Sequence, residues 1–288
     1  MKKNFKLLLL FVLVLASASY AVAQKQPDKE KFAELNSTQI HYVSEGKGTD
    51  AIVLVHGWGC NLTLWRDQIA ELSKRTRVVA LDLPGHGMSD KPETKYDMDL
   101  FAAAIDAVMK DAGVERAVLV GHSMGTPVVR QFYRKYPQKT LALVIVDGGL
   151  RPFGTKEQRD QFMAPLRGPA YKEVLKNMGN AMTATLSAAD KERIGASFAV
   201  VPQSVLVSAM EAMGEDSLYA TDKINVPVLA ILAKSPYWPA DTEQFLRGLA
   251  PDLDYQMWDG VSHFLFMDKP KEFNAAVIAF LDKKKLLK

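Results

Sequence analysis

A serine occupies the centre of a G-x-S-x-G motif at residues 121–125, which read Gly-His-Ser-Met-Gly. The spacing of apolar residues predicts a buried strand directly before this motif and a helix directly after it. A serine on such a tight strand-to-helix turn has a strained backbone and an exposed hydroxyl. Side chains at the two glycine positions would collide there. The motif therefore predicts that Ser123 is a nucleophile that forms a covalent acyl intermediate.

His263 is the predicted general base. It follows the last predicted strand, in a turn that begins Asp259-Gly260. We expect this turn to return beside Ser123, so that the imidazole can take the serine proton and pass it to the leaving group. The chain has five histidines, and His122 is expected to point elsewhere on so tight a turn.

A second glycine-rich turn, His56-Gly57-Trp58-Gly59, follows a predicted strand upstream of the serine. In acyl transfer the tetrahedral intermediate carries its charge on one oxygen, which two N–H groups about 3 Å away stabilise. We predict that the backbone of Trp58 and of Met124, the residue after the nucleophile, donates these two hydrogen bonds. His56 is expected to brace the loop rather than to transfer protons.

The acid that orients the base has two candidates, Asp147 and Asp241. Both satisfy the chain order Ser, acid, His. Asp147 ends the predicted strand 141–146 and is expected at the carboxyl end of the sheet, where such sites form. Asp241 lies in residues 239–243, where a helix N-cap would explain an aspartate equally well. Asp147 is the favoured candidate.

The elements that must position these residues are short apolar runs that alternate with longer amphipathic segments. Strands are predicted at residues 51–55, 77–81, 117–120, 141–146, 228–232 and 255–258, with an edge strand at 39–43. Helical spacing of apolar residues occupies residues 65–72, 100–112, 126–135 and 271–281. This alternation predicts an α/β fold with a mostly parallel central sheet flanked by helices.

Residues 150–224 interrupt the alternation, with helical stretches at 172–180 and 204–213 and no convincing strand. An insertion of this length after the sixth strand predicts a helical cap over the strand ends. It contains five methionines, Met163, Met178, Met182, Met210 and Met213. Methionine is flexible and polarizable, so such a surface adapts to apolar ligands. Packing of the cap against the core would explain the same residues.

Four segments resemble the α/β-hydrolase superfamily in order and spacing: His56-Gly57, residues 83–89 (Leu-Pro-Gly-His-Gly-Met-Ser), residues 121–125 and residues 260–264. The resemblance is greatest to the esterase, carbon–carbon hydrolase and cofactor-free haloperoxidase branch, which carries a helical cap at this place. It implies the α/β-hydrolase fold and cleavage of a carboxylic ester, thioester or lactone by a Ser-Asp-His triad without a cofactor. Dehalogenases and epoxide hydrolases of the superfamily have an aspartate where this chain has Ser123.

The resemblance leaves the acid and the reaction open. Many relatives place the acid after the strand predicted at 228–232, in a Gly-x-x-Asp pattern, but this chain reads Ala233-Lys234-Ser235-Pro236 there. Some relatives use the location of Asp147. The same residues would also suit a cofactor-free perhydrolase or haloperoxidase, or a carbon–carbon bond hydrolase. A non-catalytic ligand-binding member of the fold is the alternative from another class.

The first 23 of the 288 residues predict a signal peptide, because a basic stretch and an apolar run precede Ala21-Val22-Ala23. We therefore expect a periplasmic or secreted protein without a stable membrane span after cleavage. Residues 24–288 are predicted to form a single domain.

Composition narrows the expected partners of this domain. Its one cysteine, Cys60, excludes an intramolecular disulfide, and no His/Cys cluster has metal-ligand spacing. The net charge of +3 argues against a nucleic-acid partner. The expected partner is a small-molecule apolar acyl substrate.

Overall fold

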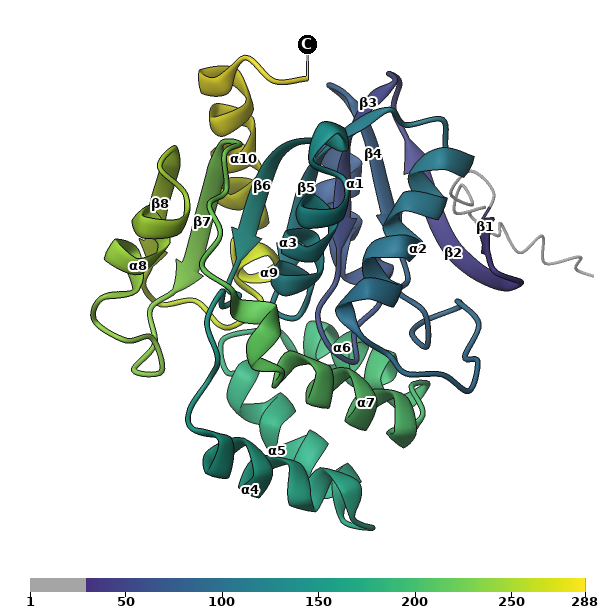
Figure 1. Ribbon diagram of the computed structural model, residues 1–288, viewed down its shortest axis with the longest axis vertical. Coiled ribbons are helices and arrows are strands. Elements are labelled where there is room, and N and C mark those ends of the chain that lie inside the picture. Colours follow the sequence, from purple (N-terminus) through teal and green to yellow (C-terminus); the bar gives the residue numbers. More distant parts are fainter. Residues whose placement is uncertain (1–29, 288) are drawn as a thin grey trace, which may run out of the picture.

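Runs of Val, Leu, Ile and Ala form the middle of one eight-stranded sheet, in the order β1-β2-β4-β3-β5-β6-β7-β8 (Figure 1). The computed structural model describes residues 30–287, so the predicted signal peptide lies outside the described residues. Strands β3 to β8 are parallel, and β2 is antiparallel to both of its neighbours. The strands are β1 (Lys31–Leu35), β2 (Thr38–Glu45), β3 (Asp50–Val55), β4 (Arg77–Leu81), β5 (Arg116–His122), β6 (Thr140–Val146), β7 (Val228–Ala233) and β8 (Leu253–Trp258).

The predicted α/β fold with a mostly parallel sheet is confirmed, but the prediction of residues 39–43 as an edge strand is wrong. These residues belong to β2, which pairs with β4 on one side and with β1 on the other. The sequence pattern missed β1 because it reads Lys-Phe-Ala-Glu-Leu, and only Ala33 of these five residues is buried. An outer strand that exposes most of its side chains has no clear apolar pattern.

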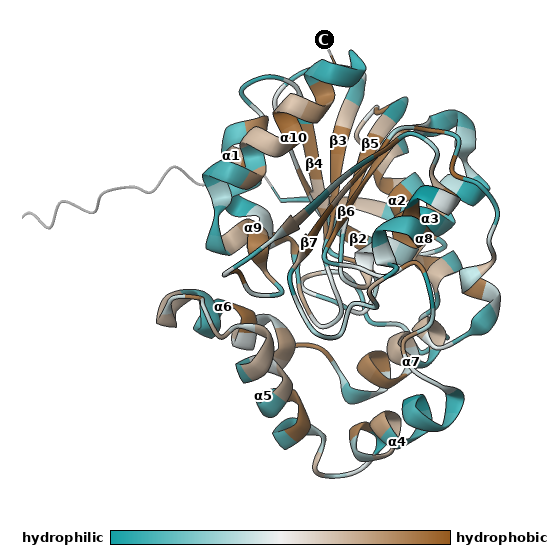
Figure 2. Cartoon of the chain, turned by 90° about the vertical axis from the view of Figure 1, so that its left-hand side faces the viewer, coloured by the Kyte–Doolittle hydropathy of each residue, from teal (hydrophilic) through white to brown (hydrophobic). Residues whose placement is uncertain are grey.

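Helices cover both faces of the sheet (Figure 2). One core cluster joins α2 (Met98–Asp111), α3 (Gly125–Lys135) and α8 (Thr242–Leu249) to one set of strand side chains, which includes Val53 and Leu119. The other cluster joins α1 (Arg66–Leu72), α9 (Leu265–Asp268) and α10 (Pro270–Lys284) to the alternate set, which includes Ile52 and Val118. Neighbouring residues of a strand point to opposite faces of the sheet, so every central strand is buried on both faces.

The cap is a helical insertion between β6 and β7, beneath the carboxyl ends of the parallel strands in Figure 1. Its helices are α4 (Lys156–Arg167), α5 (Tyr171–Met182), α6 (Ala188–Ala199) and α7 (Gln203–Met213), followed by the short 3-10 helix η3 (Asp216–Tyr219). In residues 30–287 no single helix is long and apolar enough to cross a membrane; only α6 and α7 taken together, bent by 97°, reach that length and composition. Two further 3-10 helices are η1 (Leu62–Trp65) and η2 (Pro137–Lys139).

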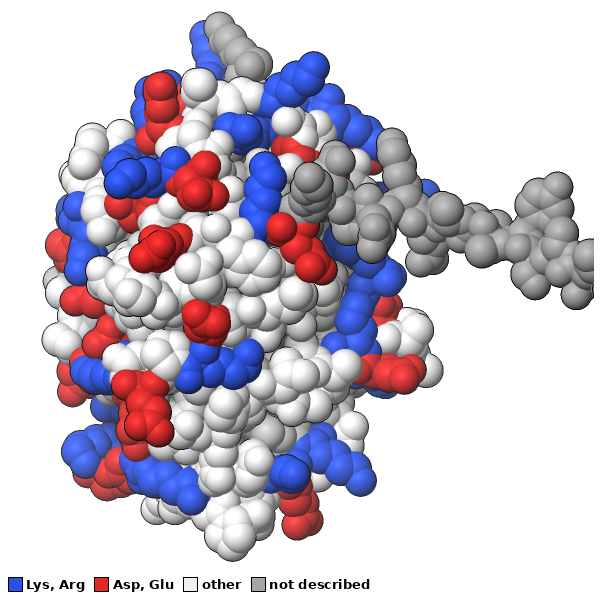
Figure 3. Space-filling model, turned by 90° about the vertical axis from the view of Figure 1, so that its right-hand side faces the viewer, with Lys and Arg blue, Asp and Glu red and all other residues white. Residues whose placement is uncertain are grey.

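Charges of both signs are interspersed on the face shown in Figure 3, without a large region of one sign. Many cations of the described residues have a partner, for example Arg134 with Asp222 at 2.7 Å and Arg116 with Asp50 at 2.6 Å.

The turn between β5 and α3 has an unusual backbone at Ser123, whose φ is +53°. Little space surrounds the turn. A Cβ atom on Gly121 would lie 2.3 Å from the carbonyl oxygen of Gly125, and one on Gly125 would lie 2.5 Å from the carbonyl oxygen of Val55. Because both obstacles are backbone atoms, only glycine fits at these two positions of the motif.

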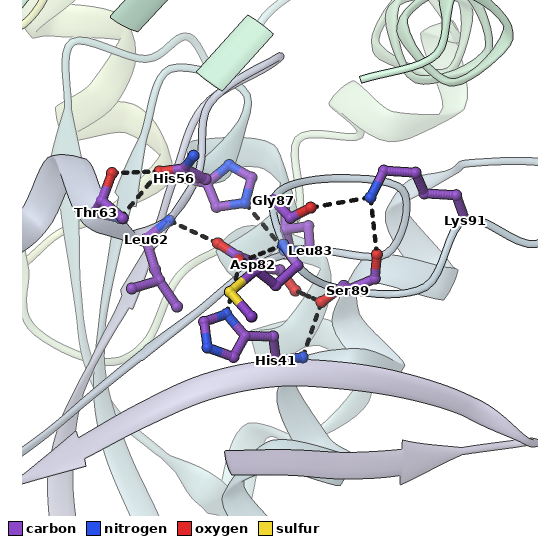
Figure 4. A network of polar contacts seen from close by, with 11 residues as sticks. His41, His56, Leu62, Thr63, Asp82, Leu83, Gly87, Ser89 and Lys91 are labelled. Carbon is purple, nitrogen blue, oxygen red and sulfur yellow. Dashed lines mark hydrogen bonds and ion pairs between the residues drawn. The ribbon is translucent and has the colours of Figure 1, made fainter. Parts of the chain in front are cut away.

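A buried polar network ties the loop after β3 to the loop after β4 (Figure 4). The Asp82 carboxylate accepts hydrogen bonds from the backbone N–H of Leu62 at 2.7 Å, from His41 Nδ1 at 2.8 Å and from the N–H of Met88 at 2.9 Å. His41 and Asp82 are 4% and 2% exposed. Unpaired burial of such a carboxylate would be costly, so the network holds its members in one arrangement.

His56 braces the same two loops. The N–H of Leu83 donates to His56 Nε2 at 3.0 Å, so that nitrogen carries no proton and Nδ1 donates to the carbonyl of Gly57 at 2.8 Å. Together with the bond between Leu62 and Asp82, this contact anchors the glycine-rich turn at both ends.

We predict that Gly125→Ala lowers the free energy of unfolding by about 1–3 kcal/mol, because the added methyl group has no free space. Gly248→Ala, in α8, is the matched control, since a Cβ atom there meets nothing within 4 Å. It should raise stability by about 0.5–1 kcal/mol. Urea unfolding followed by circular dichroism measures both, and equal effects would contradict the steric account.

We predict that stability falls as the pH drops from 7 to 5. Burial lowers the pKa of His56 and His122, and lowers that of His86 to about 3. In the unfolded chain these groups titrate near 6.5, so below that pH the unfolded state binds more protons than the folded state. Each histidine then contributes a slope of up to about 1.4 kcal/mol per pH unit. His86→Gln should reduce the slope measured by urea unfolding by about a third; an unchanged slope would speak against burial of a neutral His86.

Candidate active site

A cavity of about 500 Å³ lies between the carboxyl ends of the strands and the cap. Its wall contains Ser123, Asp147 and His263, together with Gly57 and Trp58. These residues come from the loops after β3, β5, β6 and β8, which are far apart in the sequence. The structure thus brings Ser123, Asp147, His263 and Trp58 of the predicted site to one cavity, whereas Met124 is buried and does not line it.

Ser123 lies on the strained turn at the amino end of α3. Its N–H donates to the carbonyl of Val146 at 2.9 Å, and its own carbonyl accepts from the N–H of Thr126 at 2.9 Å. These bonds keep the residue at its positive φ, a conformation that costs a non-glycine residue on the order of 1 kcal/mol. The free N–H groups and dipole of a helix N-terminus favour negative charge beside the serine.

His263 and Asp147 form a short hydrogen bond. The Nδ1 atom of His263 donates to one carboxylate oxygen of Asp147 at 2.6 Å, and the other oxygen accepts from the N–H of Ala233 at 2.8 Å. The Asp147 residue is only 7% exposed. Since Nδ1 carries the proton, Nε2 is the nitrogen that can accept one, and it has no hydrogen-bond partner among residues 30–287.

The backbone around His263 is held from the core and from the cap. His122 donates from Nε2 to the His263 carbonyl at 2.9 Å, and the His263 N–H donates to the Met182 carbonyl, at the end of α5, at 3.3 Å. Ser262 gives its N–H and its hydroxyl to one oxygen of Asp268, at 2.7 and 2.6 Å. The other oxygen accepts from Thr185 of the cap at 2.5 Å.

Sequence reasoning missed these positioning roles of His122 and Asp268. His122 was expected to point elsewhere, but it lines the same cavity as Ser123, and its ring packs 4.7 Å from the ring of His263. Its place beside Ser123 carried no sign of that contact. Asp268 follows His263 by five residues, and this spacing alone says nothing of a bond back to Ser262.

The alternative acid, Asp241, lies elsewhere. It precedes α8 without a side-chain capping bond and forms an ion pair with Arg151 at 2.8 Å, with 59% of its side chain exposed. It does not line the cavity of Ser123. The geometry therefore favours Asp147.

The glycine-rich turn after β3 lies against the serine turn. A Cβ atom on Gly57 would come within 3.0 Å of the Ser123 Cβ and of His122 Nδ1. The indole of Trp58 donates to the Leu206 carbonyl of α7 at 2.8 Å, which fixes this turn to the cap. The backbone N–H groups of Trp58 and Met124 donate to no acceptor in residues 30–287.

Methionines and aromatic side chains form the apolar wall of the cavity. Four of the five cap methionines lie there, whereas Met163 is buried in the core. The apolar wall includes Met178, Met182, Met210, Met213, Trp238 and Phe264. Across residues 30–287, no group of three His, Cys, Asp or Glu side chains is placed to hold a metal ion.

Comparison with known proteins points to the same fold. The family model for the alpha/beta hydrolase fold matches residues 50–176. A 2-hydroxy-6-oxononadienedioate/2-hydroxy-6-oxononatrienedioate hydrolase of Burkholderia vietnamiensis is 28% identical over 263 residues, 84% of this chain and 91% of that protein. An uncharacterised protein of Mycobacterium tuberculosis is 28% identical over 258 residues, 81% of this chain and 75% of that protein.

Solved structures agree on the fold. An esterase from Exiguobacterium antarcticum superposes with a TM-score of 0.79 at 18% identity, covering 88% of this chain and all of that one. The sheet order, the helical insertion after β6 and the serine turn after β5 are parts of one fold. The chain is an α/β-hydrolase fold protein.

Proposed function

We propose that this protein is a serine hydrolase that cleaves a carboxylic ester, thioester or lactone through an acyl-enzyme. The observation that carries the proposal is the 2.6 Å hydrogen bond between His263 and Asp147 in a cavity whose wall also contains Ser123. Nucleophilic acyl transfer needs a base oriented by a buried carboxylate and a serine held on a strained turn, and the wall of this cavity contains both.

In the proposed reaction the Ser123 oxygen attacks the substrate carbonyl while His263 Nε2 takes the hydroxyl proton. Asp147 stabilises the imidazolium that forms, and the N–H groups of Trp58 and Met124 bind the oxyanion. The imidazolium then protonates the leaving group, and the acyl group stays on Ser123. Water, activated by the same imidazole, attacks the acyl-enzyme and restores the serine.

The lining of the cavity favours a substrate with an apolar acyl group. Its wall contains four methionines and several aromatic side chains, and methionine adapts to apolar ligands of different shape. Short and medium acyl esters are therefore the first substrates to test.

Hydrolysis of a carbon–carbon bond is a second candidate, favoured by the Burkholderia relative, which is named for that kind of substrate and matches over most of its length. It would use the same serine and histidine. Rates on p-nitrophenyl butyrate and on a vinylogous 1,5-diketone separate the two activities. A rate of reaction with acetate and hydrogen peroxide that exceeds the rate of ester hydrolysis would instead indicate perhydrolysis.

We predict that Ser123→Ala lowers kcat on p-nitrophenyl butyrate by at least about 1,000-fold, because the nucleophile and the base act as a unit. Labelling by a fluorophosphonate should be lost as well. The control is Ser217→Ala, an exposed serine outside the cavity, which should leave both readouts unchanged. Undiminished turnover in Ser123→Ala would exclude the proposed site.

The two candidate acids can be compared directly. Asp147→Asn should lower kcat by at least about 100-fold, because an amide no longer stabilises the imidazolium. Asp241→Asn should change kcat by less than about twofold, since its carboxylate binds Arg151 at the surface. Steady-state rates of the two folded variants decide between them: collapse in Asp241→Asn alone would assign the acid there.

A further inference from the structure

A second cavity, of about 430 Å³, lies within the cap between α5 and α6. Neither Ser123 nor His263 lines it. Apolar side chains form much of its wall, among them Leu175 of α5 and Ile194 and Phe198 of α6. In Figure 2 the two helices are neighbours at the left of the cap, opposite α4 and α7.

Helix α5 has an apolar face that no other element covers completely. Leu175, Met178 and Met182 are spaced i, i+3 and i+7, so they share one side of the helix. All three are only partly buried, and none of the twelve residues of α5 is buried. By contrast, α7 buries five of its eleven residues. This face of α5 borders both cavities: the second one, called here the cap cavity, and the one that contains Ser123, called here the catalytic cavity.

The two cavities are separated by a thin partition of side chains. A space of only about 10 Å³ lies between them and shares Leu175, Ile194 and Phe198 with the cap cavity. It shares Met178 and Met182 with the catalytic cavity. Because methionine side chains change conformation easily, rotation of these two residues would join the cavities.

The wall of the cap cavity carries positive charge. Lys172, Lys176 and Lys191 line it, and no acidic side chain does. None of the three forms an ion pair with a carboxylate of residues 30–287; Lys191 donates only to the Ala184 carbonyl, at 3.3 Å. Lys172 and Lys176 stand at i and i+4 on one helix, where like charges repel unless an anion lies between them.

We propose that the cap cavity binds an amphiphile with a single apolar chain and a terminal anionic group. The chain packs against Leu175 of α5 and against Ile194 and Phe198 of α6, and the anionic group lies among Lys172, Lys176 and Lys191. This proposal rests on the proposed function in one respect: a substrate with the ester at the other end of such a chain would reach Ser123 through the partition. Binding to the cap does not itself need catalysis.

Titration of the Ser123→Ala protein with laurate below its micellar concentration, followed by tryptophan fluorescence, tests the site. Trp58 borders the partition and reports its occupation. Changing Lys172, Lys176 and Lys191 to Gln together should weaken laurate binding at least about tenfold. Changing the exposed Lys31, Lys47 and Lys110 to Gln is the matched control for net charge and should leave the affinity unchanged. Dodecyltrimethylammonium should bind at least about tenfold more weakly than laurate.

A second variant tests the location of the chain. A Cβ atom on Gly195 meets nothing within 4 Å, and the residue lines the cap cavity, so Gly195→Leu should fill the cavity without disturbing the fold. It should abolish laurate binding and leave p-nitrophenyl butyrate hydrolysis by the Ser123-containing enzyme unchanged. Laurate binding that survives this variant or the lysine substitutions, or no binding at all, would overturn the proposal. Activity that persists in Ser123→Ala would instead overturn the proposed function and leave the binding result standing.

The substrate class is tested by giving the Ser123-containing enzyme two different ester substrates. The lysine substitutions should lower kcat/KM for the mono-p-nitrophenyl ester of dodecanedioic acid at least about tenfold, and leave kcat/KM for p-nitrophenyl butyrate unchanged. An equal loss on both esters would show that the lysines act on the catalytic cavity as a whole. That result would exclude recognition of the anionic end.

Discussion

The whole site depends on a close approach of backbone segments at the carboxyl end of β5. Gly121 and Gly125 let the serine turn form against β3, and Gly57 lets the next loop lie on that turn. A single methyl group at any of them would meet atoms at 3.0 Å or less. This packing places the hydroxyl, the free N–H groups and the cavity in one region. The strain at Ser123 persists because the surrounding structure is close-packed.

His263 is held by both the core and the cap. The core supplies Asp147 and His122, and the cap supplies the Met182 carbonyl and, through Asp268, Thr185. The orientation of His263 is thereby linked to the position of α5. Displacement of the carboxyl end of α5 would stretch the 3.3 Å bond from His263 to Met182. A ligand bound in the proposed cap site would therefore be linked to the orientation of His263 through the Met182 carbonyl.

The cap and the core differ in how completely their apolar side chains are buried. Core strands are buried on both faces, whereas α5 leaves its apolar side partly uncovered and lines cavities with methionines. The glycine-rich turn is anchored independently of substrate, by Asp82 and His56 below and by the bond from Trp58 to Leu206 above. An anchored glycine-rich turn and a methionine-lined wall suit the proposed acyl transfer to groups of different shape.

The sequence alone determined the strand-to-helix turn at Ser123, the parallel sheet and the helical insertion, because each follows from steric limits or periodicity over a few neighbouring residues. It missed β1, whose exposed side chains leave no period. It favoured Asp147 over Asp241 but could not decide between them, since both satisfy the same chain order. Only the tertiary structure separated them, by placing Asp147 at 2.6 Å from His263 and Asp241 beside Arg151. It also revealed the cavity under α5. Contacts across more than a hundred residues depend on strand order and loop paths, which local pattern does not encode.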